Sequence, residues 1–169
     1  MINYKELKAK DWREFQKLRL EALQECPDNF ASSFEEEVKN TEEKLIKILD
    51  DNYIIGAFDH DDLIAMVAFY KLNFRRKIEH KGIIWGLYLK KTYRSNGIAS
   101  ELLNENIISE VFTKSCNVLQ VQLSVNTKNI KAINLYKKHG FIIYGTELES
   151  IKIGNNFHDE YLMYLKLKK

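Results

Sequence analysis

The segment 87–100, LYLKKTYRSNGIAS, contains the residues best suited to bind an anion. We expect it to pass from a strand into a helix, whose first turn offers unpartnered main-chain N–H groups and partial positive charge. Such an end attracts phosphate. Gly97 permits a positive φ or a close ligand approach, and the small Ala99 leaves the first turn uncrowded. Three cationic side chains lie nearby: Lys90, Lys91 and Arg94. The segment predicts a pyrophosphate site; alternatively, Gly97 only eases the turn and the basic residues form a solvated face.

Two better-known phosphate motifs do not compete with this segment. Gly140 and Gly145 have the spacing of a P-loop, but Thr146 occupies the lysine position. The dinucleotide-binding pattern G-x-G-x-x-G does not occur in the sequence. Binding of nucleoside triphosphates and of dinucleotides is therefore disfavoured.

The elements that must position this segment follow from periodicity and turn signals. Strands are expected at 2–7, 53–58, 63–72, 81–90, 118–125, 141–147 and 158–167, with the second and third forming a hairpin. Gly86, inside the fourth strand, indicates a bulge or a close approach by another molecule. This order predicts an α/β (α+β) fold with a largely antiparallel first half.

Helices are expected between these strands. The first is opened by an Asp11-x-x-Glu14 capping box and stops before Pro27, and the second begins at Asn40 or Thr41. The third covers 97–112, and the fourth, 126–139, is closed by Gly140 in a left-handed cap. The inward side of the first helix carries Trp12, Phe15, Leu18, Ala22 and Leu23.

The amino-acid composition and net charge limit the class of protein to which the chain can belong. The 169 residues are 45% hydrophobic and 30% charged, without a linker-like stretch, so we expect one domain, 1–169, with a buried core. The net charge of +2 argues against a nucleic-acid partner. No apolar run reaches the length of a membrane helix, and the first residues lack a secretion signal, so a cytoplasmic location is expected. Cys26 and Cys116 lack the spacing of a zinc site and are expected to be reduced and unpaired.

Two patterns resemble the signatures of the GNAT acetyltransferase superfamily. Arg94-x-x-Gly97-x-Ala99 matches its Q/R-x-x-G-x-G/A motif between the fourth strand and the third helix. The second pattern is Asn129-x-x-Ala132-x-x-Leu135-Tyr136-x-x-x-Gly140-Phe141. The resemblance implies a mainly antiparallel twisted sheet of about seven strands with four helices, splayed between strands 4 and 5.

The resemblance also implies an acetyl-CoA-dependent N-acetyltransferase that transfers the acetyl group directly to a primary amine and releases CoA. The main chain of Leu87 and Leu89 would bond the pantetheine arm like an added strand, and Asn129 would bond the same arm. The Tyr136 hydroxyl would give a proton to the leaving thiolate. The pyrophosphate would be held, beside Arg94, by the amides of Ser95, Asn96, Gly97, Ile98, Ala99 and Ser100.

The sequence departs from the family pattern in the pyrophosphate loop. Many members have glycine at the position of Ser95 and a basic residue at that of Asn96. Asn96 can still adopt a positive φ more readily than most residues, so cofactor binding is expected despite these departures.

A protonated amine must lose a proton before it attacks, so the reaction needs a base or a water chain. Glu79 is assigned this role, with His80, Asp159 and Glu160 as further candidates, although each is also typical of a surface or structural residue. No metal is expected.

The sequence defines the amine that accepts the acetyl group less well than it defines the cofactor site. The connection 30–37 contains Glu35, Glu36 and Glu37, whose carboxylates would attract a cationic amine or simply form a solvated helix face. A polyamine is the first hypothesis, followed by peptide N-termini and amino-sugar drugs. The alternatives are a non-catalytic acyl-CoA-binding or regulatory module and a partner-binding domain without cofactor. The sequence does not choose between a monomer and a homodimer.

Overall fold

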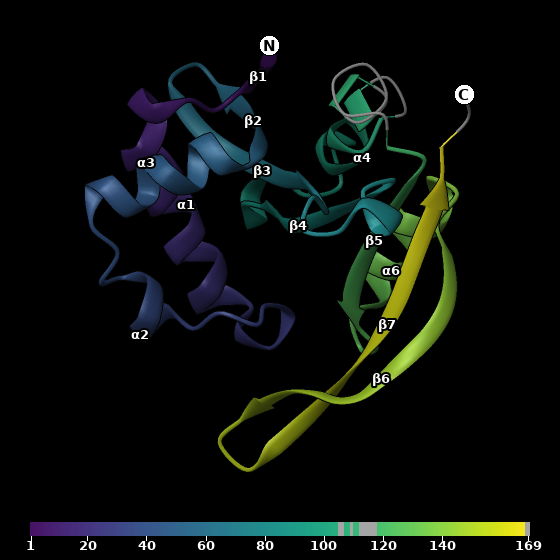
Figure 1. The fold of residues 1–169 in the computed structure, drawn as a ribbon. Coiled ribbons are helices and arrows are strands. Elements are labelled where there is room, and N and C mark those ends of the chain that lie inside the picture. Colours follow the sequence, from purple (N-terminus) through teal and green to yellow (C-terminus); the bar gives the residue numbers. More distant parts are fainter. Residues whose placement is uncertain (105–106, 109, 112–117, 168–169) are drawn as a thin grey trace. The chain divides into compact units, whose positions relative to one another are not determined.

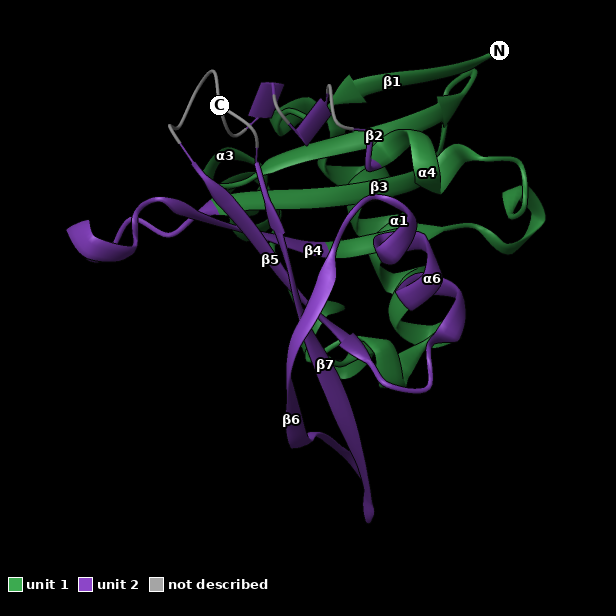
Figure 2. Ribbon diagram, turned by 90° about the vertical axis from the view of Figure 1, so that its right-hand side faces the viewer, with its two compact units in different colours: residues 1–70, 86–102 green, residues 71–85, 103–169 purple. Residues whose placement is uncertain are grey.

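The computed structural model describes residues 1–104, 107–108, 110–111 and 118–167 (Figure 1). The strands belong to a seven-stranded sheet of order β1-β2-β3-β4-β5-β7-β6. By compactness the chain divides into two units, Met1–Tyr70 with Gly86–Leu102, and Lys71–Trp85 with Leu103–Lys169, which Figure 2 colours separately. The expectation of one domain stays a prediction.

The mixed α/β fold predicted from the sequence is confirmed. The strands are β1 (Ile2–Glu6), β2 (Tyr53–Asp59), β3 (Asp62–Lys71), β4 (Lys81–Leu89), β5 (Gln120–Asn126), β6 (Ile142–Ile153) and β7 (Asn156–Lys166). The helices are α1 (Trp12–Glu25), α2 (Phe34–Glu37), α3 (Glu42–Asp51), α4 (Ile98–Leu102) and α6 (Ile130–Lys138). No helix in the described ranges is long and apolar enough to span a bilayer.

In the first unit, β1, β2 and β3 form an antiparallel meander whose apolar residues make the core. The predicted inward side of α1 is correct for Phe15, Leu18, Ala22 and Leu23, which are buried, whereas Trp12 is only partly covered. The predicted capping box is wrong: Asp11 makes no side-chain cap on α1, and its Oδ2 instead accepts from the Lys8 N–H at 2.9 Å.

β4 contains the bulge that Gly86 predicts. The Lys90 N–H donates to the Ile64 carbonyl, and the Leu72 N–H donates to the Lys81 carbonyl, both at 2.9 Å. Between these contacts β3 advances eight residues, from 64 to 72, while β4 advances nine, from 81 to 90. The extra residue in β4 requires a local change of direction, and the φ of +66° at Gly86 supplies it.

In the second unit, β5 pairs with β4 in parallel over Lys81–Ile83 and Gln120–Gln122. β4 continues to Leu89 and β5 to Asn126, so this pairing covers only the first part of each strand in the described chain. This agrees with the splay expected between strands 4 and 5. The other pairings of this unit are antiparallel: β5 with β7, and β7 with β6.

β6 and β7 form a long hairpin (Figure 1). Both strands extend further toward their connection than the sequence predicts. The hairpin turns at Gly154, whose φ is +59°, between Ile153 and Asn156. Gly-Asn is a hairpin signal. The polar residues around it do not have a strand pattern, so the strand ends on either side were not predicted.

Two helix predictions need correction. The helix expected over 97–112 is interrupted, because α4 ends at Leu102 and a new helical turn begins with the Ile108 N–H donating to the Asn104 carbonyl. Part of that range, 105–106, 109 and 112, lies outside the described residues, as does Cys116. The helix expected over 126–139 begins only at Ile130, but its Gly140 has the predicted left-handed φ, +86°.

Candidate active site

The loop before α4 combines strain with exposed main chain. After a single helical turn at Lys91–Tyr93, Ser95 has a φ of +68° and Gly97 one of +78°. The left-handed conformation thus falls on Ser95 and not on Asn96, although a side chain disfavours it. Asn96 instead donates from Nδ2 to the Tyr93 carbonyl at 3.3 Å.

The amides at the start of α4 are arranged as anion binding requires. The Glu101 N–H donates to the Gly97 carbonyl at 3.0 Å. Ile98 and Ala99 precede this donor, and the first N–H groups of an α-helix have no intrahelical acceptor. A Cβ built on Gly97 would meet no atom within 4 Å, so the loop is open at this point. The residues present therefore fit a diphosphate bound through main-chain N–H groups.

The cationic side chains of the loop are largely engaged by the protein itself. The Lys90 Nζ lies 2.7 and 2.8 Å from the two carboxylate oxygens of Asp62. Nη2 of Arg94 lies 2.6 Å from Oε1 of Glu25, while its Nε donates to the Leu89 carbonyl at 3.1 Å. Two of the three cationic side chains that the sequence places near the phosphate therefore have carboxylate partners within the protein. Lys91 is exposed.

The main chain at the end of β4 has one side directed away from β3. The Lys90 N–H bonds β3, and adjacent residues of an antiparallel strand direct their N–H and C=O groups to opposite sides. The main-chain N–H and C=O groups of Leu89, and those of Leu87 two residues earlier, therefore point away from β3. The contact from Arg94 to the Leu89 carbonyl agrees with this orientation.

Tyr136 lies on α6, in the second unit. Its side chain is 7% exposed and packs edge-on against Phe141, with ring centroids 5.7 Å apart. Burial raises the pKa of the Tyr136 hydroxyl well above its ordinary value of 10.0. A phenol in this environment keeps its proton at neutral pH and can donate it.

Asn129 caps α6. Its Oδ1 accepts from the Ala132 N–H at 3.2 Å, which satisfies one of the first amides of the helix. The cap occupies only the carbonyl oxygen of the side chain, and the amide Nδ2 carries two further N–H groups that can donate to a ligand.

Asn126, which sequence reasoning missed, is a buried polar residue at the end of β5. It is 2% exposed, its Oδ1 accepts from the Lys128 N–H at 2.9 Å, and its Nδ2 lies 3.4 Å from Nδ1 of His158. The sequence signal that could have identified Asn126 is a polar residue at the end of an apolar strand. These contacts fix the turn between β5 and α6, and with it the position of the Asn129 cap.

The four candidate bases have different surroundings. Glu79 is exposed in the turn that follows Arg76–Ile78, and His80 is partly exposed. Asp159 accepts from the Glu149 N–H at 2.8 Å, and Glu160 accepts from the Ser150 hydroxyl at 2.6 Å. The last two therefore have structural contacts within the β6–β7 hairpin, and the assignment of Glu79 stays a prediction. No cluster of metal ligands occurs in the part of the chain that the structure describes.

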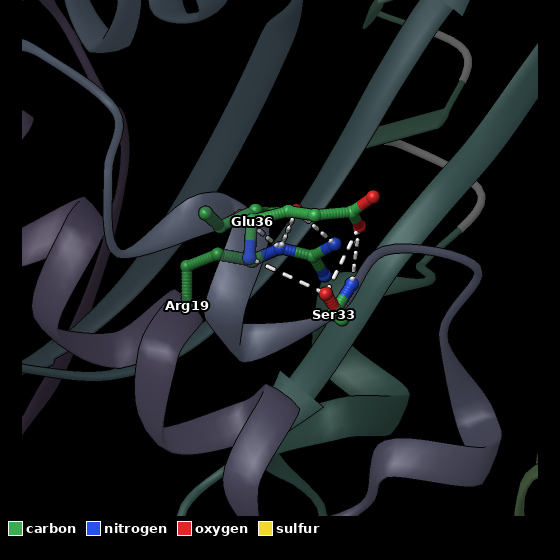
Figure 3. Close-up of polar contacts among 4 residues, drawn as sticks. Arg19, Ser33 and Glu36 are labelled. Carbon is green, nitrogen blue, oxygen red and sulfur yellow. Dashed lines mark hydrogen bonds and ion pairs between the residues drawn. The ribbon is translucent and has the colours of Figure 1, made fainter. Parts of the chain in front are cut away.

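Most carboxylates of the acidic triplet at α2, Glu35 to Glu37, have hydrogen-bond or ion-pair partners within the protein. Arg19, a buried residue of α1, binds both carboxylate oxygens of Glu37 at 2.9 to 3.2 Å. Oε2 of Glu36 accepts from the N–H and the hydroxyl of Ser33, each at 3.0 Å, in a capping box (Figure 3). Two of the three carboxylates expected to attract an amine thus stabilise the connection between α1 and α2, and Glu35 is exposed.

Comparison with known proteins decides the family. The model of the acetyltransferase (GNAT) family matches residues 11–141. The chain belongs to this family. The matched range includes both signature segments, 94–99 and 129–141, so the resemblance stated from the sequence is confirmed.

Individual relatives of the chain are also acetyltransferases. The chain is 28% identical over 116 residues to streptothricin acetyltransferase from Escherichia coli, covering 68% of this chain and 62% of that protein. It therefore spans less than two thirds of that curated relative. A GNAT acetyltransferase from Streptococcus pneumoniae superposes with a TM-score of 0.84 at 28% identity, covering 98% and 99% of the two chains.

A more distant fold relative was solved with its cofactor acetyl-CoA. This is the yncA protein of Salmonella typhimurium, which has a TM-score of 0.84 at 11% identity and covers 100% of this chain and 95% of its own. At that identity the match concerns the GNAT fold alone.

Proposed function

We propose that this GNAT protein is an acetyl-CoA-dependent N-acetyltransferase that acts on a primary amine by direct transfer. The observation that supports this best is the loop 95–97, where Ser95 and Gly97 have positive φ and lead directly into the first N–H groups of α4, those of Ile98 and Ala99. Bound acetyl-CoA would supply an activated acetyl thioester, from which the amine takes the acetyl group while CoA leaves as a thiol.

The roles proposed for individual residues are those that the family resemblance implies. The main chain of 95–100 holds the diphosphate, and the outward side of Leu87 and Leu89 bonds the pantetheine arm as an added strand would. Asn129 donates to the same arm through Nδ2. The Tyr136 hydroxyl, kept protonated by its apolar surroundings, donates to the leaving sulfur.

The acceptor is proposed only as a primary amine. Glu36 and Glu37 are occupied by Ser33 and Arg19, so the acidic triplet no longer singles out a polyamine. A streptothricin acetyltransferase is among the relatives, which adds streptothricin to polyamines, peptide N-termini and amino-sugar drugs as candidate acceptors.

A thiol-release assay with acetyl-CoA and a panel of these amines tests the proposal. We expect at least one amine to give sustained turnover, with many thiols released per chain and little release when the amine is omitted. Binding of acetyl-CoA without turnover on any amine would favour the non-catalytic acyl-CoA-binding module instead. Absence of binding would favour a partner-binding domain.

A further inference from the structure

Glu25, the last residue of α1, reaches the loop that precedes α4. Its two carboxylate oxygens have separate partners: Oε1 lies 2.6 Å from Nη2 of Arg94, and Oε2 accepts from the Tyr88 hydroxyl at 2.6 Å. Arg94 is also fixed by the Leu89 carbonyl and by the ring of Tyr88, 5.8 Å from its guanidinium. All of these residues belong to the first unit.

This network ends one residue before the strained part of the loop. Ser95, next to Arg94, has a φ of +68°. A residue with a side chain stays in this region only where its surroundings leave no easier conformation. The Arg94 N–H adds a further restraint, since it donates to the Lys91 carbonyl at 3.3 Å. Arg94 is thus held through its main chain and through both ends of its guanidinium.

We propose that Glu25 is a positioning residue for coenzyme binding: by holding Arg94, it keeps 95–97 in the conformation that presents the amides to the diphosphate. This inference rests on the proposed function, because it assumes that the loop binds the diphosphate of acetyl-CoA. In this proposal Glu25 acts through Arg94 and has no catalytic role of its own.

Whether removal of Glu25 weakens or tightens acetyl-CoA binding separates this positioning role from a purely electrostatic one. The hydrogen bond from Tyr88, together with Arg94, lowers the pKa of Glu25, so its carboxylate is charged at neutral pH. A negative charge beside an anion site weakens anion binding. If Arg94 were only a phosphate ligand, removing Glu25 would free it and tighten binding. The positioning role predicts the reverse.

The test compares acetyl-CoA with acetyl-pantetheine, which has the thioester but no diphosphate. Glu25→Ala should lower kcat/KM for acetyl-CoA about tenfold, mainly through KM, because the strained loop loses its support. It should leave kcat/KM for acetyl-pantetheine unchanged. A loss of folded protein would lower both values equally, so the ratio within one variant reports on the loop alone.

Glu21→Ala is the matched control. Glu21 lies one turn earlier on α1 and also accepts from the Tyr88 hydroxyl, at 3.0 Å, whereas the ion pair with Arg94 is made by Glu25. The ratio between the two thioesters should stay at the wild-type value in this variant. An equal change in both variants, no change in Glu25→Ala, or tighter acetyl-CoA binding would each overturn the inference. Failure of the wild type to bind acetyl-CoA would instead overturn the proposed function.

Discussion

Replacing Tyr136 by phenylalanine should lower kcat about 10²- to 10⁴-fold, the range expected when a general acid is removed. The dissociation constant for acetyl-CoA, measured by calorimetry, should change little. The phenyl ring preserves the edge-on packing against Phe141, and the hydroxyl is the only group lost. The protein should therefore stay folded, and the loss should fall on turnover.

Tyr164→Phe is the matched control for this substitution. Tyr164 lies on β7 and also packs edge-on against a ring, that of Tyr144 at 5.7 Å, so the change again removes one hydroxyl from an aromatic pair of the second unit. Turnover should be near that of the wild type. Equal losses in turnover and in acetyl-CoA affinity for Tyr136→Phe would contradict the assigned role.

The raised pKa of Tyr136 gives the pH dependence a definite sign. Because burial favours the neutral phenol, Tyr136 stays protonated up to and beyond its ordinary pKa of 10.0. The stability linked to this group is present below that pH and is lost as the pH rises through the higher pKa of the folded state. Its ionisation should therefore cause no fall in kcat below about pH 10.

Gly97→Val should weaken acetyl-CoA binding roughly 10- to 100-fold, as measured by calorimetry. The φ of +78° at Gly97 lies in the left-handed region, where a side chain costs about 1–2 kcal/mol, or about tenfold in affinity if the loop relaxes. The valine would also occupy the open space beside the amides, where the diphosphate is proposed to lie.

Gly154→Val separates loop strain from general destabilisation. Gly154 has a φ of +59°, and a Cβ built there also meets no atom within 4 Å, but it lies in the turn between β6 and β7. Both variants should lose about 1–2 kcal/mol of unfolding free energy. Only Gly97→Val should lose affinity; a similar loss in both would argue against a coenzyme site at the loop.

The sequence was most informative where the pattern is local. Two runs of β-forming residues separated by the polar residues 59–62 located the β2–β3 hairpin, Pro27 marked the end of α1, Gly86 marked a bulge and Gly140 a left-handed cap. Each of these signals depends on a few neighbouring residues, because a side-chain period or a missing Cβ acts within one element. The two family motifs are also local, which is why the loop before α4 was found.

The features that were missed depend on residues far apart in the chain. The ion pair of Lys90 was not predicted, because its partner Asp62 lies 28 positions earlier. Arg94 binds Glu25 at the far end of α1, and Glu37 binds Arg19 across the connection between α1 and α2. The positive φ falls on Ser95, next to a residue that these tertiary contacts hold, and propensity alone does not include such contacts.

The most direct measurement of the central claim is a calorimetric titration of the wild-type protein with acetyl-CoA and, separately, with acetyl-pantetheine. If the main chain at 95–100 holds the diphosphate, acetyl-CoA should bind at one site per chain, and the fragment without the diphosphate should bind much more weakly. Equal affinities for the two thioesters, or no heat with acetyl-CoA, would contradict the account.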